Sequence, residues 1–155
     1  MSESNLPRKH PILPPFYFLG SIVLMVLLDR FLPIVTLIEP PLTYLGWILF
    51  ALGLGVAFNV NGRFKRAGTA IKPFEDSSAL VTDGPFSFSR NPIYLGALVS
   101  LLGIFVVLGS LSPLAPIPPF VYIIQTRFIV VEEGMLEETF GEAYRDYKKR
   151  VRRWI

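Results

Sequence analysis

The sequence predicts an all-α, polytopic membrane protein with about four transmembrane helices and an amphipathic C-terminal helix in the cytosol. Hydrophobic residues make up 52% of the 155-residue chain and the mean hydropathy is +0.50, more apolar than a soluble domain of this size needs. Four stretches approach the roughly 20 apolar residues that cross a bilayer. Basic residues also gather in alternate connecting segments, as they do in multi-pass membrane proteins.

The four predicted spans are residues 14–33, 41–60, 92–111 and 113–131. The first carries Asp29 and Arg30 near its far end, where charged side chains can reach the interface. The second and third spans have no charged residue. The fourth opens with several prolines, so its regular helix should begin near Pro119. Basic residues precede the first span without a small-residue cleavage site after it, so we expect an uncleaved anchor.

The distribution of basic residues predicts the orientation in the membrane. All but two of the 15 lysines and arginines lie in the N-terminal tail, in the loop between the second and third spans, or in the C-terminal tail. Both termini and this middle loop, residues 59–91, should therefore face the cytosol, in a prokaryotic inner membrane. Any site for a polar ligand should lie on that face. The net charge of +3 reflects this asymmetry and does not indicate a nucleic-acid partner.

Composition excludes several kinds of site. The chain has no cysteine, and His10 in the N-terminal tail is its single histidine, so we expect no disulfide, thiolate nucleophile or metal centre. It also lacks a Gly-rich phosphate loop, a Rossmann fingerprint and a Ser/His/Asp set.

The first polar cluster is "DGPFSFSRNPIYLG", residues 83–96. Residues 86–89 alternate as a short extended segment would. Asn91 and Pro92 have the pattern of a helix N-cap and first turn, and Arg90 could be a positive-inside anchor. Together, the helix start and Arg90 also form an electropositive pocket that suits a carboxylate. Gly96 belongs to a set of small residues, with Ser100 and Gly103, whose spacing is typical of packing between spans.

The second polar cluster is "QTRFIVVEEGMLEETFGEAYRDYKKRVRRWI", residues 125–155. Arg127 lies in apolar sequence just before Glu132 and Glu133, so it must reach the interface or find an anion, and structural pairing and a ligand role are both open. Apolar residues then recur every three or four positions, which predicts an amphipathic helix lying on the bilayer with a possible break at Gly141. The residues of this apolar face are Leu136, Phe140, Tyr144, Tyr147, Val151 and Trp154.

Taken together, the two clusters resemble the isoprenylcysteine carboxyl methyltransferase family, including its short prokaryotic members and its phospholipid methyltransferase relatives. The resemblance covers residues 62–155. It rests on an Arg-x-Pro-x-Tyr-x-Gly element at residues 90–96, the pair Glu132-Glu133, and a Phe-Gly-x-x-Tyr-x-x-Tyr tail at residues 140–147. The corresponding organisation is one domain, residues 1–155, with two N-terminal spans in 1–61 and a cofactor-binding half in 62–155.

The resemblance implies a membrane methyltransferase that binds S-adenosylmethionine in a cytosol-facing pocket capped by the C-terminal helix. The implied cofactor-binding residues are Arg90, Asn91, Tyr94, Gly96, Glu132, Glu133, Tyr144, Tyr147 and Arg150, and the catalytic candidates are Arg127, Glu133 and Asn91. Asn91 stands where the family commonly has histidine, and an amide cannot titrate near neutrality.

Methyl transfer from a sulfonium is an in-line displacement, which needs alignment more than a covalent nucleophile. Glu132 or Glu133 would meet the cofactor's ammonium or ribose hydroxyls, and Arg90 its carboxylate. The acceptor would be lipophilic and would enter from the bilayer: a carboxylate such as isoprenylcysteine, or a lipid amine or thiol. Two alternatives are an NADPH-dependent enzyme similar to sterol reductases and a non-catalytic four-span membrane protein.

Overall fold

In a computed structural model, the described part of the chain, residues 12–67 and 79–155, is helical, with one isolated β-bridge. The main helices are α1 (Pro14–Phe31), α2 (Leu45–Ala67), α3 (Pro92–Leu108), α4 (Ile117–Ile124) and α5 (Val130–Arg150). A π-helical segment, Gln125–Ile129, joins α4 and α5 without interruption. Short 3₁₀ helices lie at Leu42–Tyr44, Gly84–Ser87 and Ser112–Leu114. The predicted all-α class is confirmed.

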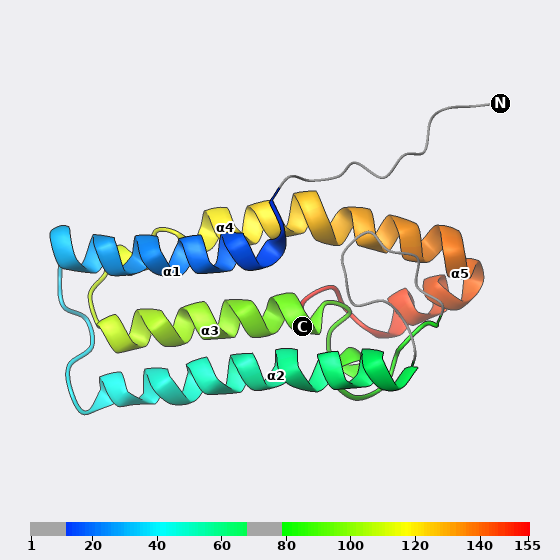
Figure 1. The fold of residues 1–155 in the computed structure, drawn as a ribbon, viewed down its shortest axis with the longest axis horizontal. Coiled ribbons are helices and arrows are strands. Elements are labelled where there is room, and N and C mark those ends of the chain that lie inside the picture. The colour runs from blue at the N-terminus through cyan, green and yellow to red at the C-terminus, as the bar shows by residue number, and fades with distance from the viewer. Residues whose placement is uncertain (1–11, 68–78) are drawn as a thin grey trace.

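Four helices, α1 to α4, run alongside one another, and α5 extends beyond them at one end (Figure 1). Among the described residues, Pro14–Phe31, Leu42–Arg63 and Ser112–Arg150 are long and apolar enough to cross a membrane. The third predicted span, α3, is apolar but has 17 residues. It ends at Leu108, earlier than predicted, because Gly109 adopts a left-handed conformation with φ of 76° and stops the helix.

The contact between α2 and α3 depends on small residues. A Cβ atom added to Gly53 would lie 2.3 Å from the carbonyl oxygen of Gly96, and one added to Gly103 would lie 2.5 Å from the amide nitrogen of Phe50. The Ser100 hydroxyl donates to the Phe50 carbonyl at 3.2 Å. Small residues of this kind let membrane helices approach closely and pack by van der Waals contact. The predicted packing role of this face of α3 is therefore confirmed.

The far end of the bundle, opposite α5, is closed by paired backbone. The Gly109 carbonyl accepts hydrogen bonds from Leu37 and Ile38, and the Val35 carbonyl accepts one from Leu111. Asp29, which the sequence placed near the end of the first span, accepts a hydrogen bond from the Ser110 hydroxyl. A charged side chain near the end of an apolar helix is thus satisfied by a polar loop.

The C-terminal helix folds back on itself. Gly141 has φ of 52° and ψ of −117° within α5, so the predicted break is confirmed. After this break Tyr144, Tyr147 and Val151 pack against Val60 of α2 and against Phe86. The prediction that this apolar face lies on the bilayer is therefore wrong, because the reversal turns the face onto the end of the bundle.

The loop before α3 also differs from expectation. Residues 86–89 were expected to be extended, but Gly84–Ser87 forms a 3₁₀ helix whose Ser87 hydroxyl donates to the Gly84 carbonyl at 2.7 Å. Phe86 is buried and Phe88 is exposed. The alternation of phenylalanine and serine thus reflects a tight turn with one buried and one exposed aromatic side chain.

Candidate active site at the start of α3

The two polar segments of the sequence, residues 83–96 and 125–155, contact each other in the structure. Arg90, the residue before the N-cap of α3, places Nη2 3.1 Å from Oε1 of Glu133, which lies in the first turn of α5. Both side chains are nearly buried, with 10% and 7% of their surfaces exposed. Buried charges are costly unless they are paired, so each side chain stabilises the other in this position.

A second guanidinium group binds the same carboxylate. Arg153 Nη2 lies 2.7 Å from Oε2 of Glu133, and Arg153 Nε lies 3.2 Å from both carboxylate oxygens. These hydrogen bonds raise the pKa of the Arg153 guanidinium above its ordinary value. Sequence reasoning missed Arg153, because nothing local distinguishes it from its basic neighbours in the tail.

Tyr94 and Glu132 form the adjacent contact. The Tyr94 hydroxyl, in the first turn of α3, donates to Oε1 of Glu132 at 2.7 Å. Tyr94 is buried. A hydrogen bond from a neutral donor to a carboxylate holds that carboxylate in one orientation. We call Arg90, Tyr94, Glu132, Glu133 and Arg153 the polar cluster.

The last five residues, which we call the C-terminal strap (residues 151–155), cross the start of α3. The strap begins where α5 ends, because Val151 is extended, with φ of −123° and ψ of 130°. Its hydrogen bonds run from Arg90 N to Arg152 O (3.0 Å), from Asn91 Nδ2 to Arg153 O (3.1 Å), from Ser89 Oγ to Arg153 O (3.2 Å) and from Trp154 Nε1 to Gln125 Oε1 (3.0 Å). The strap therefore lies against the residues that precede α3 and ties them to the π-helical segment.

Asn91 occupies the N-cap position of α3, but its side chain makes no capping hydrogen bond. Instead the amide donates to the strap, and the Asn91 backbone N–H is bound by the Ser89 hydroxyl at 3.1 Å. The expected capping role is thus replaced by a contact between segments 62 residues apart in the chain.

Tyr144 and Tyr147 support the site from the second half of α5. Tyr144 is 1% exposed, and its ring centroid lies 6.0 Å from that of Tyr147. The Tyr147 hydroxyl donates to the Phe86 carbonyl at 2.7 Å. These tyrosines fasten the folded-back part of α5 to the loop that carries Arg90.

Three residues of the predicted site lie elsewhere. Arg127 is exposed and makes no ion pair with another described residue, so of the two roles left open for it, structural pairing with a glutamate is not observed in this part of the chain. The neighbouring Phe128 turns into the core and leaves Arg127 facing outward. Arg150 is also exposed. The helix ends at Arg150, and the extended segment that follows brings Arg153 to Glu133 instead. Gly96 lies in the α2–α3 contact, so packing explains its glycine.

One hydrogen-bond donor of the polar cluster lacks an acceptor, and this donor indicates which ligand the cluster could bind. Arg90 Nε is buried and has no hydrogen-bond partner in the described part of the chain. A buried donor without an acceptor costs about 1–3 kcal/mol. A carboxylate from a bound molecule would satisfy it, and the two glutamates could receive the cationic or hydroxyl groups of the same molecule. The cluster therefore suits a zwitterionic ligand such as the methionine part of S-adenosylmethionine.

Comparisons with known proteins identify what the chain is similar to. A family model described as phospholipid methyltransferase matches residues 42–143. The chain is 32% identical over 72 residues to protein-S-isoprenylcysteine O-methyltransferase of Schizosaccharomyces pombe, a match that covers 46% of this chain and 30% of the yeast protein. It is 38% identical over 63 residues to an uncharacterized protein of Haemophilus influenzae, covering 41% of this chain and 100% of that protein.

Among solved structures, the eukaryotic intramembrane Ras methyltransferase, isoprenylcysteine carboxyl methyltransferase, matches with a TM-score of 0.65. The identity is 24%, and the match covers 91% of this chain and 51% of the other. At this identity the likeness speaks for the fold, and this chain spans about half the length of that protein.

Proposed function

Because the chain belongs to the phospholipid methyltransferase family, we propose that it transfers a methyl group from S-adenosylmethionine to a lipophilic acceptor at the cytosolic face of the membrane. The observation that carries the proposal is the 3.1 Å contact between Arg90 and Glu133. It joins two sequence elements more than 40 residues apart into one buried, charged cluster at the boundary between apolar helices and polar loops.

When bound, S-adenosylmethionine supplies a methyl group on a positively charged sulfur. In the proposed arrangement, Arg90 Nε donates to the ligand carboxylate, because this atom is buried and lacks an acceptor. The N–H groups of Ile93 and Tyr94, in the first turn of α3, have no intrahelical acceptor and add to the attraction for an anion. Glu132 and Glu133 face the ammonium group or the ribose hydroxyls.

Tyr94 and the strap have positioning roles in this proposal. Tyr94 holds the Glu132 carboxylate through a 2.7 Å hydrogen bond. The strap, anchored by Asn91, shields the cluster from water, and exclusion of water strengthens every charged contact inside it. Tyr144 and Tyr147 hold the second half of α5 in place. We assign positioning rather than proton transfer to Asn91, because its amide donates to the strap and cannot titrate near neutrality.

The acceptor would be a carboxylate, an amine or a thiol on a lipophilic molecule. An ionised carboxylate can attack without a base, whereas an amine or thiol must lose a proton. Glu132 is the carboxylate we assign to that proton, because Glu133 already binds two guanidinium groups. The apolar outer surfaces of the bundle give such an acceptor a route from the bilayer.

We also propose that the cluster faces the cytosol. The start of α1, the end of α2, the start of α3 and α5 lie at one end of the bundle (Figure 1). The sequence segments attached to these helix ends contain nearly all of the basic residues. Positive charge of this kind is retained on the cytosolic side during insertion.

Ligand binding to the purified protein in detergent tests the proposal. S-adenosylhomocysteine, the product form of the cofactor, should raise the melting temperature, because a ligand at 100 times its Kd stabilises by about 2.7 kcal/mol. NADPH should have no effect. Stabilisation by NADPH alone would favour a reductase, and stabilisation by neither compound would favour a non-catalytic protein; both results contradict the proposal.

Glu133→Gln should lose S-adenosylhomocysteine binding. Glu142→Gln, which changes an exposed carboxylate on the same helix, is the matched control and should bind as the wild type does. Incubation with methyl-labelled cofactor and extracted membrane lipids then identifies the acceptor by the lipid that becomes labelled. Wild-type protein that binds the cofactor but labels no lipid-soluble molecule would contradict the proposed acceptor class.

A further inference from the structure

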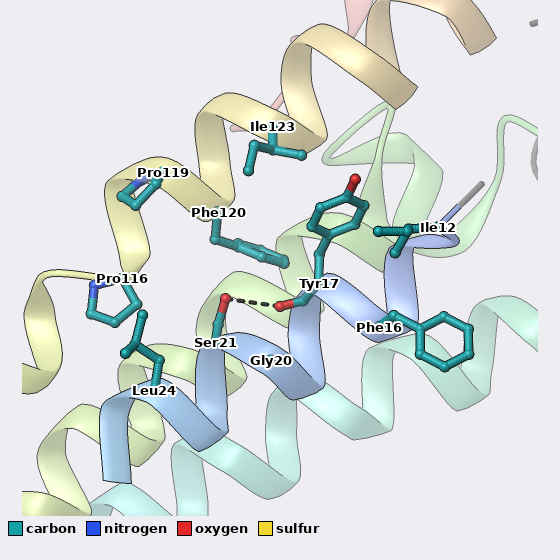
Figure 2. A pocket seen from close by; sticks show the side chains of 10 residues that line it. All are labelled: Ile12, Phe16, Tyr17, Gly20, Ser21, Leu24, Pro116, Pro119, Phe120 and Ile123. Atoms are coloured by element: carbon teal, nitrogen blue, oxygen red, sulfur yellow. Dashed lines mark hydrogen bonds between the residues drawn. The ribbon is translucent and has the colours of Figure 1, made fainter. Parts of the chain in front are cut away.

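An apolar groove of about 560 Å³ lies between α1 and α4 (Figure 2). No residue of the polar cluster lines it. Phe16, Gly20 and Leu24 of α1 form one wall, and Pro119 and Ile123 lie on the other. The volume falls within the range of about 300–1,000 Å³ typical of sites for small lipophilic ligands. Both walls belong to helices that are long and apolar enough to cross a membrane, so a hydrocarbon chain matches the groove.

Arg127 follows four residues after Ile123, the last residue of the chain that lines this groove. On α4, the groove-lining residues Pro119 and Ile123 are four positions apart, and each directly precedes a core residue, Phe120 or Ile124. Arg127, four residues further on in the π-helical segment, precedes the buried Phe128 in the same way and is exposed, which favours the groove side for its side chain.

A ring contact fixes the level of Arg127 along the groove. The ring of Tyr17, which lines the groove from α1, meets the ring of Phe128 edge-on with 5.9 Å between centroids. In Figure 2 the Tyr17 side chain extends from α1 toward α4. The residue next to Phe128 therefore lies level with the start of α1, where the apolar walls end.

We propose that the groove binds one chain of a membrane lipid whose anionic phosphate headgroup pairs with Arg127. Charge complementarity supports this occupant, because Arg127 is an exposed cation at the end of an apolar helix and has no anionic partner among the described residues. Arg127 lies outside the polar cluster. The proposed lipid site is therefore separate from the polar cluster, and the inference does not depend on the proposed function.

Lipid binding to the full chain, measured by native mass spectrometry from a neutral detergent, tests the headgroup contact. The wild type should bind phosphatidylglycerol more tightly than phosphatidylcholine with the same chains. Arg127→Gln should reduce this preference about fivefold, the effect of one basic residue near an anionic headgroup. Arg145→Gln, which changes an exposed arginine on α5, is the matched control and should keep the preference.

A second pair of variants tests the contact between the groove and the hydrocarbon chain of the lipid. A Cβ added to Gly20 meets no atom within 4 Å, so Gly20→Leu should fill the groove without distorting the helix and should weaken binding of both lipids. Gly55, in α2, has equal space around it, and Gly55→Leu should bind both lipids as the wild type does.

Three results would overturn the inference. Arg127→Gln could retain the full preference for phosphatidylglycerol, Gly20→Leu could bind lipid as well as Gly55→Leu, or inorganic phosphate alone could compete as effectively as the lipid. Because Arg127 is exposed, the Arg127→Gln variant should fold normally. It therefore still tests the inference if Gly20→Leu does not fold.

Discussion

Replacing Glu133 by glutamine keeps the shape of the side chain but removes the negative charge between two guanidinium groups. Arg90 approaches the carboxylate to 3.1 Å and has 10% of its side chain exposed, whereas Arg153 approaches to 2.7 Å and has 36% exposed. Removing one partner of a buried ion pair costs about 3–5 kcal/mol. A partly exposed partner regains water, so the Arg153 contact should add little.

We therefore expect Glu133→Gln to lower the free energy of unfolding by about 3 kcal/mol, mainly through Arg90. At about 2–4 °C per kcal/mol for a chain of this size, the melting temperature should fall by about 6–12 °C. Thermal unfolding of the purified protein in detergent, without ligand, measures this shift. Glu142→Gln supplies the control for an exposed carboxylate on the same helix.

A double-mutant cycle separates charge compensation from simple loss of contacts. Arg90→Gln together with Glu133→Gln removes both charges, so the double variant should be more stable than the sum of the single effects predicts. If Glu133→Gln melted within about 1 °C of Glu142→Gln, the carboxylate would not be compensating a buried Arg90, and the reasoning would be refuted.

Three further predictions concern packing, hydrogen bonding and topology. Gly53→Ala should destabilise the protein by about 1–3 kcal/mol in thermal unfolding, because its Cβ would meet α3 backbone at 2.3 Å, whereas Gly55→Ala, with open space, should be neutral or slightly stabilising. Tyr94→Phe should lose about 1–3 kcal/mol of stability, since a partly buried carboxylate loses its donor; an unchanged melting temperature would contradict this. The chain has no cysteine, so single introduced cysteines report its topology. In intact cells an impermeant maleimide should label Thr36→Cys, and it should label Ser87→Cys only after permeabilisation. The reverse pattern would contradict the proposed orientation.

Properties that repeat along the chain were readable from the sequence. Apolar length identified the helices that form the bundle, because a bilayer requires a run of about 20 apolar residues. The spacing of Gly96, Ser100 and Gly103 identified the face of α3 that packs against α2. Gly141 was predicted as a possible break in the amphipathic helix, where glycine is a poor helix former. Each is a local pattern in which neighbouring residues carry the information.

Which arginine meets which carboxylate was decided only by the tertiary structure. The sequence placed Arg127 and Arg150 in the site, yet both are exposed, and Arg153 binds Glu133 instead. The outcome depends on the reversal at Gly141 and on the extended backbone at Val151, which return the end of the chain to the start of α3. An arginine side chain is long and flexible, so its partner is set by where the backbone carries it, and no local spacing encodes that path.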